Sequence, residues 1–511
     1  MPGLRSAAAA ARCAARARPL AIPDPLVLAA GGALALGTVL RIVAGADLPL
    51  WLDETFTGAL AAEETFSQLI QQSLLEPNGP LYFVMMHFWS QLFGLSNGAL
   101  RFPSLVFGIA APLVTLIPIE GVSRKARFIW CIFIALWIPG IWYSQEARCY
   151  SLLLCLAMGA TVAYARLLAM PNMRRAIIWT CLGSLAILTH YHALLLIGLQ
   201  GIAYLVIHRT RAIRTWPAAL AFLPPFAWIW LQLPRIEQFA DPSSAWFELL
   251  TLADFFDIVD FTVGEVGLAT PLALIAAFAL IVGLQRNPAP SGVEVSDNSS
   301  AYAWVVVGTA ALAAVVVFAV GMLRPSFTPR YLMSFVPGMM LGLALITVAL
   351  GRRWALAPAA CALIFVASAV TWAIKGNWHG IKYYSFEAAS DALMRSGAER
   401  VVFLLDSPMT RVYDPSQLQS AGGFFFRRER ASVLIEPIYL RPGEDPNTRL
   451  LDAASSPGSA ILWIYDVNVR ATAATAHPPR IEQIDREWHC RNFGRLWYGV
   501  IACDRRARPL N

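Results

Sequence analysis

The sequence predicts an α-helical polytopic membrane protein with a small soluble α/β domain at its C-terminal end. Composition is the first observation: 57% of the 511 residues are hydrophobic and 14% are charged, which excludes an ordinary soluble enzyme. The second is that apolar segments recur between residues 26 and 374, many near the length of roughly 20 residues that a bilayer requires. The third is that residues 375–511 contain no such segment and have the pattern of helices and strands.

Residues 26–374 are predicted to form a transmembrane domain of about 11 helices. The predicted spans cover residues 26–44, 100–119, 128–143, 149–168, 176–189, 192–207, 217–233, 268–284, 301–322, 331–350 and 354–374. Residues 47–98 are amphipathic and only partly apolar, a pattern typical of helices that lie in the membrane interface.

The formal net charge of +7 arises from basic loops, and we expect no nucleic-acid partner. Arg and Lys are concentrated in short loops between alternate spans, as the positive-inside rule requires of cytoplasmic loops. Residues 1–25 then form a basic cytoplasmic N-terminus. The loops 144–148, 189–192, 234–267 and 323–330 lie outside, together with the C-terminal domain. This topology predicts a multi-pass protein of the cell inner membrane with residues 375–511 in the periplasm.

The C-terminal domain shows a helical pattern at residues 387–396 and buried strands at 401–405 and 460–465. Residues 490–503 alternate aromatic and polar side chains, which predicts a hairpin with Asn492, Phe493 and Gly494 near its turn. Cys490 and Cys503 flank this segment. We expect a disulfide between them if the domain lies in an oxidising compartment, and two unrelated free thiols are the alternative.

Asp53 and Glu54 form an acidic pair just outside the first predicted span. Two ionised carboxylates at the edge of a bilayer are costly, so the pair predicts a functional site. The alternative is structural: Asp53 would cap the helix that follows, but capping requires only one carboxylate.

Further polar side chains lie in the other outside loops. Arg148 is available for an anionic ligand, and the alternative is an arginine that reaches for lipid headgroups. Glu76 with His190 or His192 predicts a site for a divalent metal ion, although interfacial histidines are more often structural. We assign donor phosphate binding to Arg148, Arg330, Tyr331 and Tyr82.

This set of side chains suits a lipid-linked phosphate whose headgroup lies at the outer membrane face. The chemistry that fits is displacement at the anomeric carbon of a sugar. A carboxylate would take the proton of an acceptor hydroxyl, and cations would stabilise the leaving lipid phosphate. The sequence has no Walker loop and no glycine-rich nucleotide motif in a strand–turn–helix context, so a nucleotide donor is not expected.

Four segments, in this order, resemble motifs of the bacterial GT-C glycosyltransferases. They are Leu50-Trp51-Leu52-Asp53-Glu54, Asn78-Gly79-Pro80-Leu81-Tyr82, Leu100-Arg101-Phe102-Pro103-Ser104 and Ser144-Gln145-Glu146-Ala147-Arg148-Cys149-Tyr150. That family includes protein O-mannosyltransferases, the lipid A aminoarabinose transferase and rhizobial lipopolysaccharide galacturonosyltransferases. The resemblance covers roughly residues 26–350.

The resemblance implies a polyprenyl-phosphate-sugar donor and inverting transfer outside the cytoplasmic membrane. It implies Asp53 as the catalytic base, with Glu54 beside it. Glu76 and Pro77 match a Glu-Lys-Pro segment that helps to bind a divalent metal in the aminoarabinose transferase, but the lysine is missing here. Gly79-Pro80 stands where many relatives have Pro-Pro.

A lipid or lipid-linked-sugar flippase is the main alternative from another functional class. A flippase should carry polar residues along the bilayer midplane, whereas the charges here concentrate at one face. A ligase for long polysaccharides would have a large late loop and lack the early acidic pair. The envelope acceptor of the transferase, whether lipid, glycan or protein, is not specified by the sequence.

Overall fold

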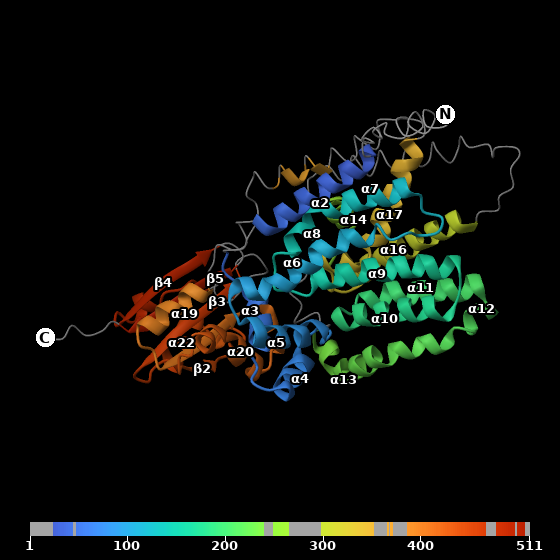
Figure 1. The fold of residues 1–511 in the computed structure, drawn as a ribbon. Coiled ribbons are helices and arrows are strands. Elements are labelled where there is room, and N and C mark those ends of the chain that lie inside the picture. The colour runs from blue at the N-terminus through green and yellow to red at the C-terminus, as the bar shows by residue number, and fades with distance from the viewer. Residues whose placement is uncertain are drawn as a thin grey trace, which may run out of the picture.

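A computed structural model of the chain places a helical body beside a smaller domain built on a β-sheet (Figure 1). It describes residues 24–43, 48–239, 249–264, 298–351, 365–366, 368–370, 372, 386–466, 477–495 and 498–505. The predicted domain boundary at residue 374 lies outside these ranges and stays a prediction.

Among the described residues, four helices are long and apolar enough to cross a membrane. They are α2 (Pro25–Val43), α6 (Asn97–Val114), α9 (Tyr150–Ala169) and α16 (Asn298–Leu323). Two further apolar helices, α11 (Ala193–His208) and α17 (Val336–Gly351), are shorter. The predicted helical architecture with apolar, membrane-length helices is thereby confirmed. The count of about 11 spans is not confirmed, and the predicted spans 268–284 and most of 354–374 lie outside the described residues.

The remaining elements of the helical body are shorter. They are α7 (Arg124–Leu136), α8 (Ile138–Tyr143), α10 (Met173–Thr189), α12 (Thr210–Ile213), η1 (Trp216–Phe222), α13 (Leu223–Phe239), η2 (Leu252–Asp254), α14 (Phe255–Val263) and η3 (Pro329–Ser334). Three predicted spans are divided in two: residues 128–143 form α7 and α8, residues 217–233 fall in η1 and α13, and residues 331–350 fall in η3 and α17.

The break between α7 and α8 has a local cause. Pro139, in the first turn of α8, has no backbone N–H, so it cannot donate to the Ala135 carbonyl one turn earlier. Arg41 of α2 supplies the missing donor: its Nη1 lies 2.7 Å from the Ala135 oxygen and 2.9 Å from the Gly37 oxygen. The buried guanidinium thereby fastens the first apolar helix to the end of α7.

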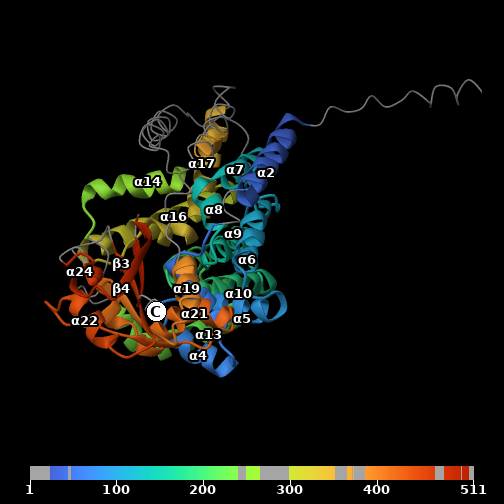
Figure 2. The same ribbon diagram turned by 90° about the vertical axis from the view of Figure 1, so that its left-hand side faces the viewer.

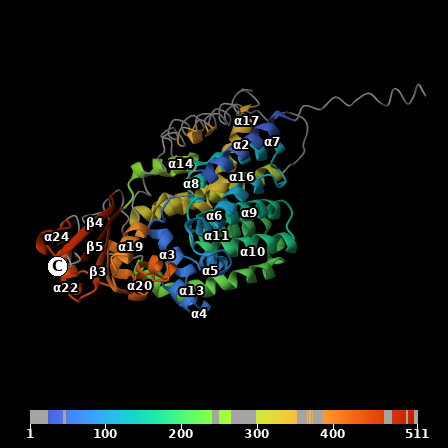
Figure 3. The ribbon, with the colours of Figure 1, turned by 60° about the vertical axis from the view of Figure 1, so that its left-hand side comes forward.

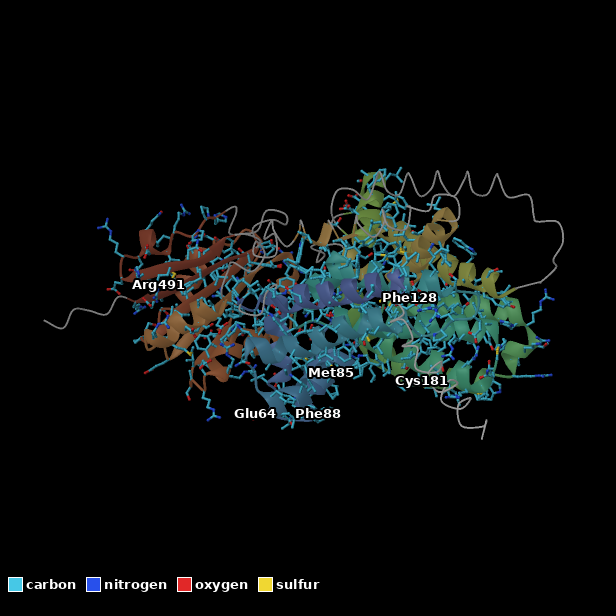
Figure 4. The ribbon with its side chains drawn as sticks, turned by 45° about the horizontal axis from the view of Figure 1, so that its top comes forward. Glu64, Met85, Phe88, Phe128, Cys181 and Arg491 are labelled. Atoms are coloured by element: carbon cyan, nitrogen blue, oxygen red, sulfur yellow. A yellow bond between two sulfur atoms is a disulfide. The ribbon has the colours of Figure 1, made fainter. Side chains whose placement is uncertain are left out.

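Within the described residues 48–98, three short helices precede α6, and the interfacial position predicted for this segment stays a prediction. They are α3 (Leu52–Ala61), α4 (Phe66–Leu75) and α5 (Leu81–Phe93). Several large apolar side chains on them are exposed, including Phe66, Phe88 and Leu92. In Figure 4, Glu64 lies near Met85 and Phe88 along one edge of the molecule. Charged and apolar side chains side by side are typical of a membrane surface.

The C-terminal domain has a five-stranded sheet in the order β2-β1-β3-β5-β4. Its strands are β1 (Arg400–Asp406), β2 (Leu434–Pro437), β3 (Ser459–Asp466), β4 (Trp488–Arg495) and β5 (Tyr498–Arg505). β1 runs parallel to β2 and β3, whereas β5 is antiparallel to β3 and β4. The strands predicted at 401–405 and 460–465 are therefore confirmed as β1 and β3.

Helices cover both faces of this sheet (Figure 2). One face packs against α19 (Phe386–Arg395), α20 (Pro415–Gly422) and α21 (Phe424–Arg428), and the other against α22 (Pro446–Ala453) and α24 (Ile481–Ile484). A short helix, η5 (Pro408–Val412), follows β1. Side chains of β1 alternate between the two cores, with Phe403 in one and Leu404 in the other. The predicted α/β domain is confirmed.

The predicted hairpin is formed by β4 and β5, and Cys490 pairs with Cys503 across it. Their Cα atoms are 4.1 Å apart and their sulfur atoms are bonded. The turn differs from the prediction. Asn492 lies at a register shift within the hairpin, and β4 continues to Arg495.

The C-terminal domain docks on α3, which lies against both α20 and α21 (Figure 3). The ring of Tyr413 stacks on that of Phe56 with centroids 5.1 Å apart. A Cβ atom at Gly58 would lie 2.6 Å from the ring of Phe424, so only glycine allows this approach. Polar contacts border the apolar centre, among them Ser420 to Glu63 at 2.7 Å. This interface brings the sheet domain over the acidic pair.

Candidate active site

The two neighbouring carboxylates of α3 have different surroundings, because successive residues of a helix point about 100° apart. Glu54 is fully buried. Arg101 of α6 donates to it through Nε at 2.7 Å and Nη2 at 2.6 Å. The backbone N–H groups of Ala147 and Trp51 also donate to Glu54, at 2.7 and 3.1 Å. Glu54 therefore joins α3 to α6 and to the 144–148 loop.

Asp53 lies between two arginines from distant parts of the chain. Its Oδ2 is 3.3 Å from Arg330 Nη1 and 3.8 Å from Arg148 Nη2. Arg148 also donates to the Asp53 backbone carbonyl at 3.1 Å. The Asp53 side chain remains 24% exposed, whereas both arginines are more buried. The residue that caps α3 is Trp51, with Glu54 in its capping box, so Asp53 is not the helix cap.

The loop that carries Arg148 is held at both ends. Gln145 donates to the Leu40 carbonyl of α2 at 3.1 Å, and Ser104 of α6 donates to the Arg148 carbonyl at 3.1 Å. Burial lowers the pKa of Arg148, but the negative charge of Asp53 outweighs it and raises the pKa above its ordinary value. The guanidinium is thus a fixed, permanent cation.

Aromatic rings surround the second arginine. The Arg330 guanidinium lies over the ring of Tyr150, 5.7 Å from its centroid. The ring of Tyr331 stacks on His192 at 4.4 Å and lies 5.1 Å from His190. Burial lowers the pKa of His192 to about 4, and burial with nearby positive charge lowers the pKa of His190 well below its ordinary value. Both rings are therefore neutral at pH 7.

Glu76 is buried where the loop before α5 meets α13 and α20. Gln417 of α20 donates to its Oε1 at 3.0 Å, and Gln232 of α13 donates to its backbone carbonyl at 2.9 Å. Burial raises the pKa of Glu76. Nearby, a Cβ atom at Gly79 would lie 2.0 Å from the Leu188 carbonyl, which explains why this chain departs from the proline of the motif.

The residues predicted to bind a metal do not form a complete ligand set. Within the ranges that the structure describes, no group of three or more His, Cys, Asp or Glu side chains is placed to hold a metal ion. The carboxylate of Glu76 is already hydrogen bonded to Gln417, and His192 stacks on Tyr331. The arrangement does not fit the predicted metal site.

Tyr82, predicted to bind the donor phosphate, is fully buried. Its hydroxyl lies 3.0 Å from Ser104 Oγ, which in turn bonds to the backbone of Arg148. Tyr82 therefore contacts the site through the loop that carries Arg148.

Sequence reasoning missed the residues that reach the site from elsewhere in the chain. Arg101 belongs to the motif Leu100–Ser104, in which no role was predicted for it. The signal for it was its positive charge, which could pair with one carboxylate of the acidic pair. Gln417 and Tyr413 lie in the C-terminal domain, some 360 positions after Asp53 by their numbers, and no local pattern marks them. Arg235 of α13 donates to the Leu75 carbonyl at 2.7 Å and to Gln417 at 2.7 Å.

Comparison with known proteins identifies the fold. No protein-family model matches the chain. No curated protein matches it. Among solved structures, ArnT from Cupriavidus metallidurans in the apo state matches with a TM-score of 0.58 and 12% identity, over 93% of this chain and 97% of that chain. The same protein bound to undecaprenyl phosphate matches with a TM-score of 0.51, 12% identity and the same coverage.

An oligosaccharyltransferase from Archaeoglobus fulgidus, in complex with Zn and sulfate, reaches a TM-score of 0.46 at 13% identity, over 86% of this chain and 68% of that chain. The ArnT matches confirm the resemblance to GT-C glycosyltransferases at the level of the fold.

Proposed function

We propose that this chain, which has the fold of ArnT, is a membrane glycosyltransferase with a polyprenyl-phosphate-sugar donor. It transfers the sugar to an envelope lipid, glycan or protein at the periplasmic face of the inner membrane. The observation that carries the proposal is the position of Asp53, a partly exposed carboxylate between the buried cations Arg148 and Arg330. ArnT has been solved with undecaprenyl phosphate, which agrees with a donor of this class.

The reaction needs one base and a site for the leaving phosphate. Asp53 accepts the proton of the acceptor hydroxyl while that oxygen attacks the anomeric carbon. The bond between this carbon and the phosphate oxygen breaks, and polyprenyl phosphate leaves with the bonding electrons. Arg148 and Arg330 balance the charge that develops on it. A single displacement of this kind inverts the anomeric centre.

Glu54 has a different role in this proposal from the one its sequence position suggested. Its carboxylate is enclosed by Arg101 and two backbone N–H groups. It is therefore a positioning residue that fixes the first turn of α3. With Glu54 occupied in this way, Asp53 is the carboxylate of the pair that can reach a substrate.

No step of the proposed reaction passes through a metal ion, because the described residues do not offer a suitable ligand set. The flippase alternative gains no support from the two ArnT structures that this chain resembles. The bonded pair Cys490–Cys503 supports the periplasmic placement, because disulfides persist in oxidising compartments.

The first prediction tests Asp53 as the base. Asp53→Asn should lower transfer by about 10²–10⁴-fold or more, because the amide cannot take the proton. Mass spectrometry of envelope lipids and glycans identifies the product in cells with the wild-type gene, and its loss is then measured in the variant. Glu64→Gln, which removes an exposed carboxylate after α3, is the matched control and should leave the product at its wild-type level. Full turnover by Asp53→Asn would contradict the assignment.

A further inference from the structure

His190 is a buried histidine among the cations and aromatic rings of the site. It follows α10 and is 4% exposed. Its Nδ1 accepts a hydrogen bond from the backbone N–H of His192 at 3.4 Å. A neutral imidazole has one nitrogen that donates and one that accepts. Because Nδ1 accepts here, the ring hydrogen lies on Nε2.

Within the described residues, His190 Nε2 is buried and has no hydrogen-bond partner. The same holds for Nε of Arg148. Buried donors without an acceptor are rare in folded proteins, because each loses its bonds to water without replacement. The His190 ring lies 6.1 Å from that of Tyr150 and 5.1 Å from that of Tyr331, between centroids. The Arg330 guanidinium lies 5.7 Å from the centroid of the same Tyr150 ring, so His190 belongs to the cluster around this cation.

The chemistry of these groups selects the missing ligand. The N–H groups at His190 Nε2 and Arg148 Nε both lack an acceptor, and Arg148 and Arg330 both carry positive charge. An anion with several acceptor oxygens would meet both needs. A phosphate group meets that description, and charge-assisted hydrogen bonds of this type are shorter and stronger than neutral ones. A hydroxyl or carbonyl ligand would supply acceptors but no negative charge, whereas the two guanidinium groups share the single carboxylate of Asp53.

We propose that His190 binds the phosphate of the polyprenyl-phosphate donor directly, by donating a hydrogen bond from Nε2, and that it is not a metal ligand. This inference rests on the proposed function and assigns the residue a role different from the one predicted from the sequence. As the bond to the sugar breaks, the phosphate gains negative charge, so a fixed N–H donor stabilises the leaving group more than the ground state.

The experiment measures binding of undecaprenyl phosphate, with undecaprenol as a probe that lacks the phosphate, to purified full-length protein in nanodiscs. His190→Phe retains an aromatic ring against Tyr331 and removes the donor. Loss of a hydrogen bond to a charged group should weaken undecaprenyl phosphate binding about ten- to hundredfold and leave undecaprenol binding unchanged. His208→Phe makes the same change at the other end of α11, where the His208 ring packs on Tyr204, and should bind both probes as wild type does.

A second variant and a chelator complete the test. His190→Gln keeps an N–H donor and should bind undecaprenyl phosphate more tightly than His190→Phe. If the Phe variant does not fold, His190→Leu replaces it as the donor-free variant in this comparison. Wild-type affinity should be the same with and without EDTA. A fall in affinity on chelation, or equal binding by wild type and donor-free variants, overturns the role of His190. Absence of undecaprenyl phosphate binding by the wild type would instead contradict the proposed function itself.

Discussion

At the scale of single residues, Arg148 is the cation most firmly placed for a phosphate. It contacts the backbone of Asp53 at 3.1 Å and its carboxylate at 3.8 Å, and its own backbone is held by Ser104. The side chain is 9% exposed, so it does not extend toward lipid headgroups. This geometry favours the phosphate assignment over the alternative of an arginine at the membrane surface.

We expect Arg148→Lys to weaken undecaprenyl phosphate binding about tenfold or more, because lysine keeps the charge but loses the planar fork that holds two oxygens. Arg148→Ala should weaken it further. Titration of the purified variants with undecaprenyl phosphate measures both effects. Arg124→Lys, at the exposed first residue of α7, is the control and should not change affinity. Unchanged affinity in Arg148→Ala would restore the headgroup interpretation.

His192 predicts a dependence of stability on pH. Its pKa is lowered by burial to about 4 in the folded protein, against an ordinary value near 6.5. The folded state therefore favours the neutral ring, and this contribution is complete above pH 6.5 and is lost as the pH falls toward 4. The contribution amounts to at most about 3 kcal/mol, and less where water reaches the ring.

His192→Phe keeps a ring against Tyr331 and removes the titration. Between pH 7.5 and pH 5, the wild-type Tm in detergent should fall more than that of the variant. The His190 ring lies 5.1 Å from that of His192, and the charge of His192 contributes to the lowered pKa of His190, so the difference between the two proteins reports the titration of His192 together with this coupling. Parallel loss of Tm in the two proteins would show that His192 does not titrate in this way.

Some of these residues could be predicted from the sequence and others could not. Asp53, Arg148 and Arg330 lie together, as their common place in the loops predicted to lie outside suggested. The different environments of Asp53 and Glu54 could not be predicted from two neighbouring residues in the sequence. They depend on the orientation of α3, which directs Glu54 toward α6. Gln417 reaches Glu76 only through the docking of a remote domain.

At the scale of elements, the pair Glu54–Arg101 fixes α3 against α6. Both side chains are buried, so Arg101→Ala leaves a carboxylate without its cation and should destabilise the protein by about 3–5 kcal/mol. Thermal unfolding in detergent measures this change. The double variant Glu54→Leu/Arg101→Met removes both charges and should recover much of the loss. Additive destabilisation in the double variant would show that the two groups act independently.

Helix boundaries were predicted less well than helices. The span at 128–143 was expected to be continuous because its residues are uniformly apolar, but hydropathy does not register the missing N–H of Pro139. The strands β1 and β3 were predicted closely, since short apolar runs of β-branched and aromatic residues between polar positions are typical of buried strands. The short strand β2 was not predicted.

At the scale of the whole molecule, the site is completed where the sheet domain covers the helical body. Tyr413 packs on Phe56, which follows Asp53 by three residues on α3. Gln417 donates a hydrogen bond to the carboxylate of Glu76. The fold class could be predicted because composition and charge placement act over the whole chain. The docking could not, because the side chains that match across the interface are far apart in sequence.

The disulfide tests the placement of this domain. We expect Cys490 and Cys503 to resist thiol labelling in unreduced, denatured protein and to label after reduction. Cys131, a buried free cysteine of α7, is the internal control and should label without reductant once the protein is denatured. Labelling of all three without reductant would remove this support for a periplasmic domain.

The bond from Arg41 to the end of α7 bears on how the chain enters the membrane. Translation produces α2 long before residues 134 and 135, whose carbonyls accept from this guanidinium. During that interval a charged side chain near the end of the first apolar helix lacks its later acceptors, at a cost of about 2.5–3.5 kcal/mol if it lies at the bilayer centre. The contacts of the first apolar helix are therefore complete only once the end of α7 has been synthesised.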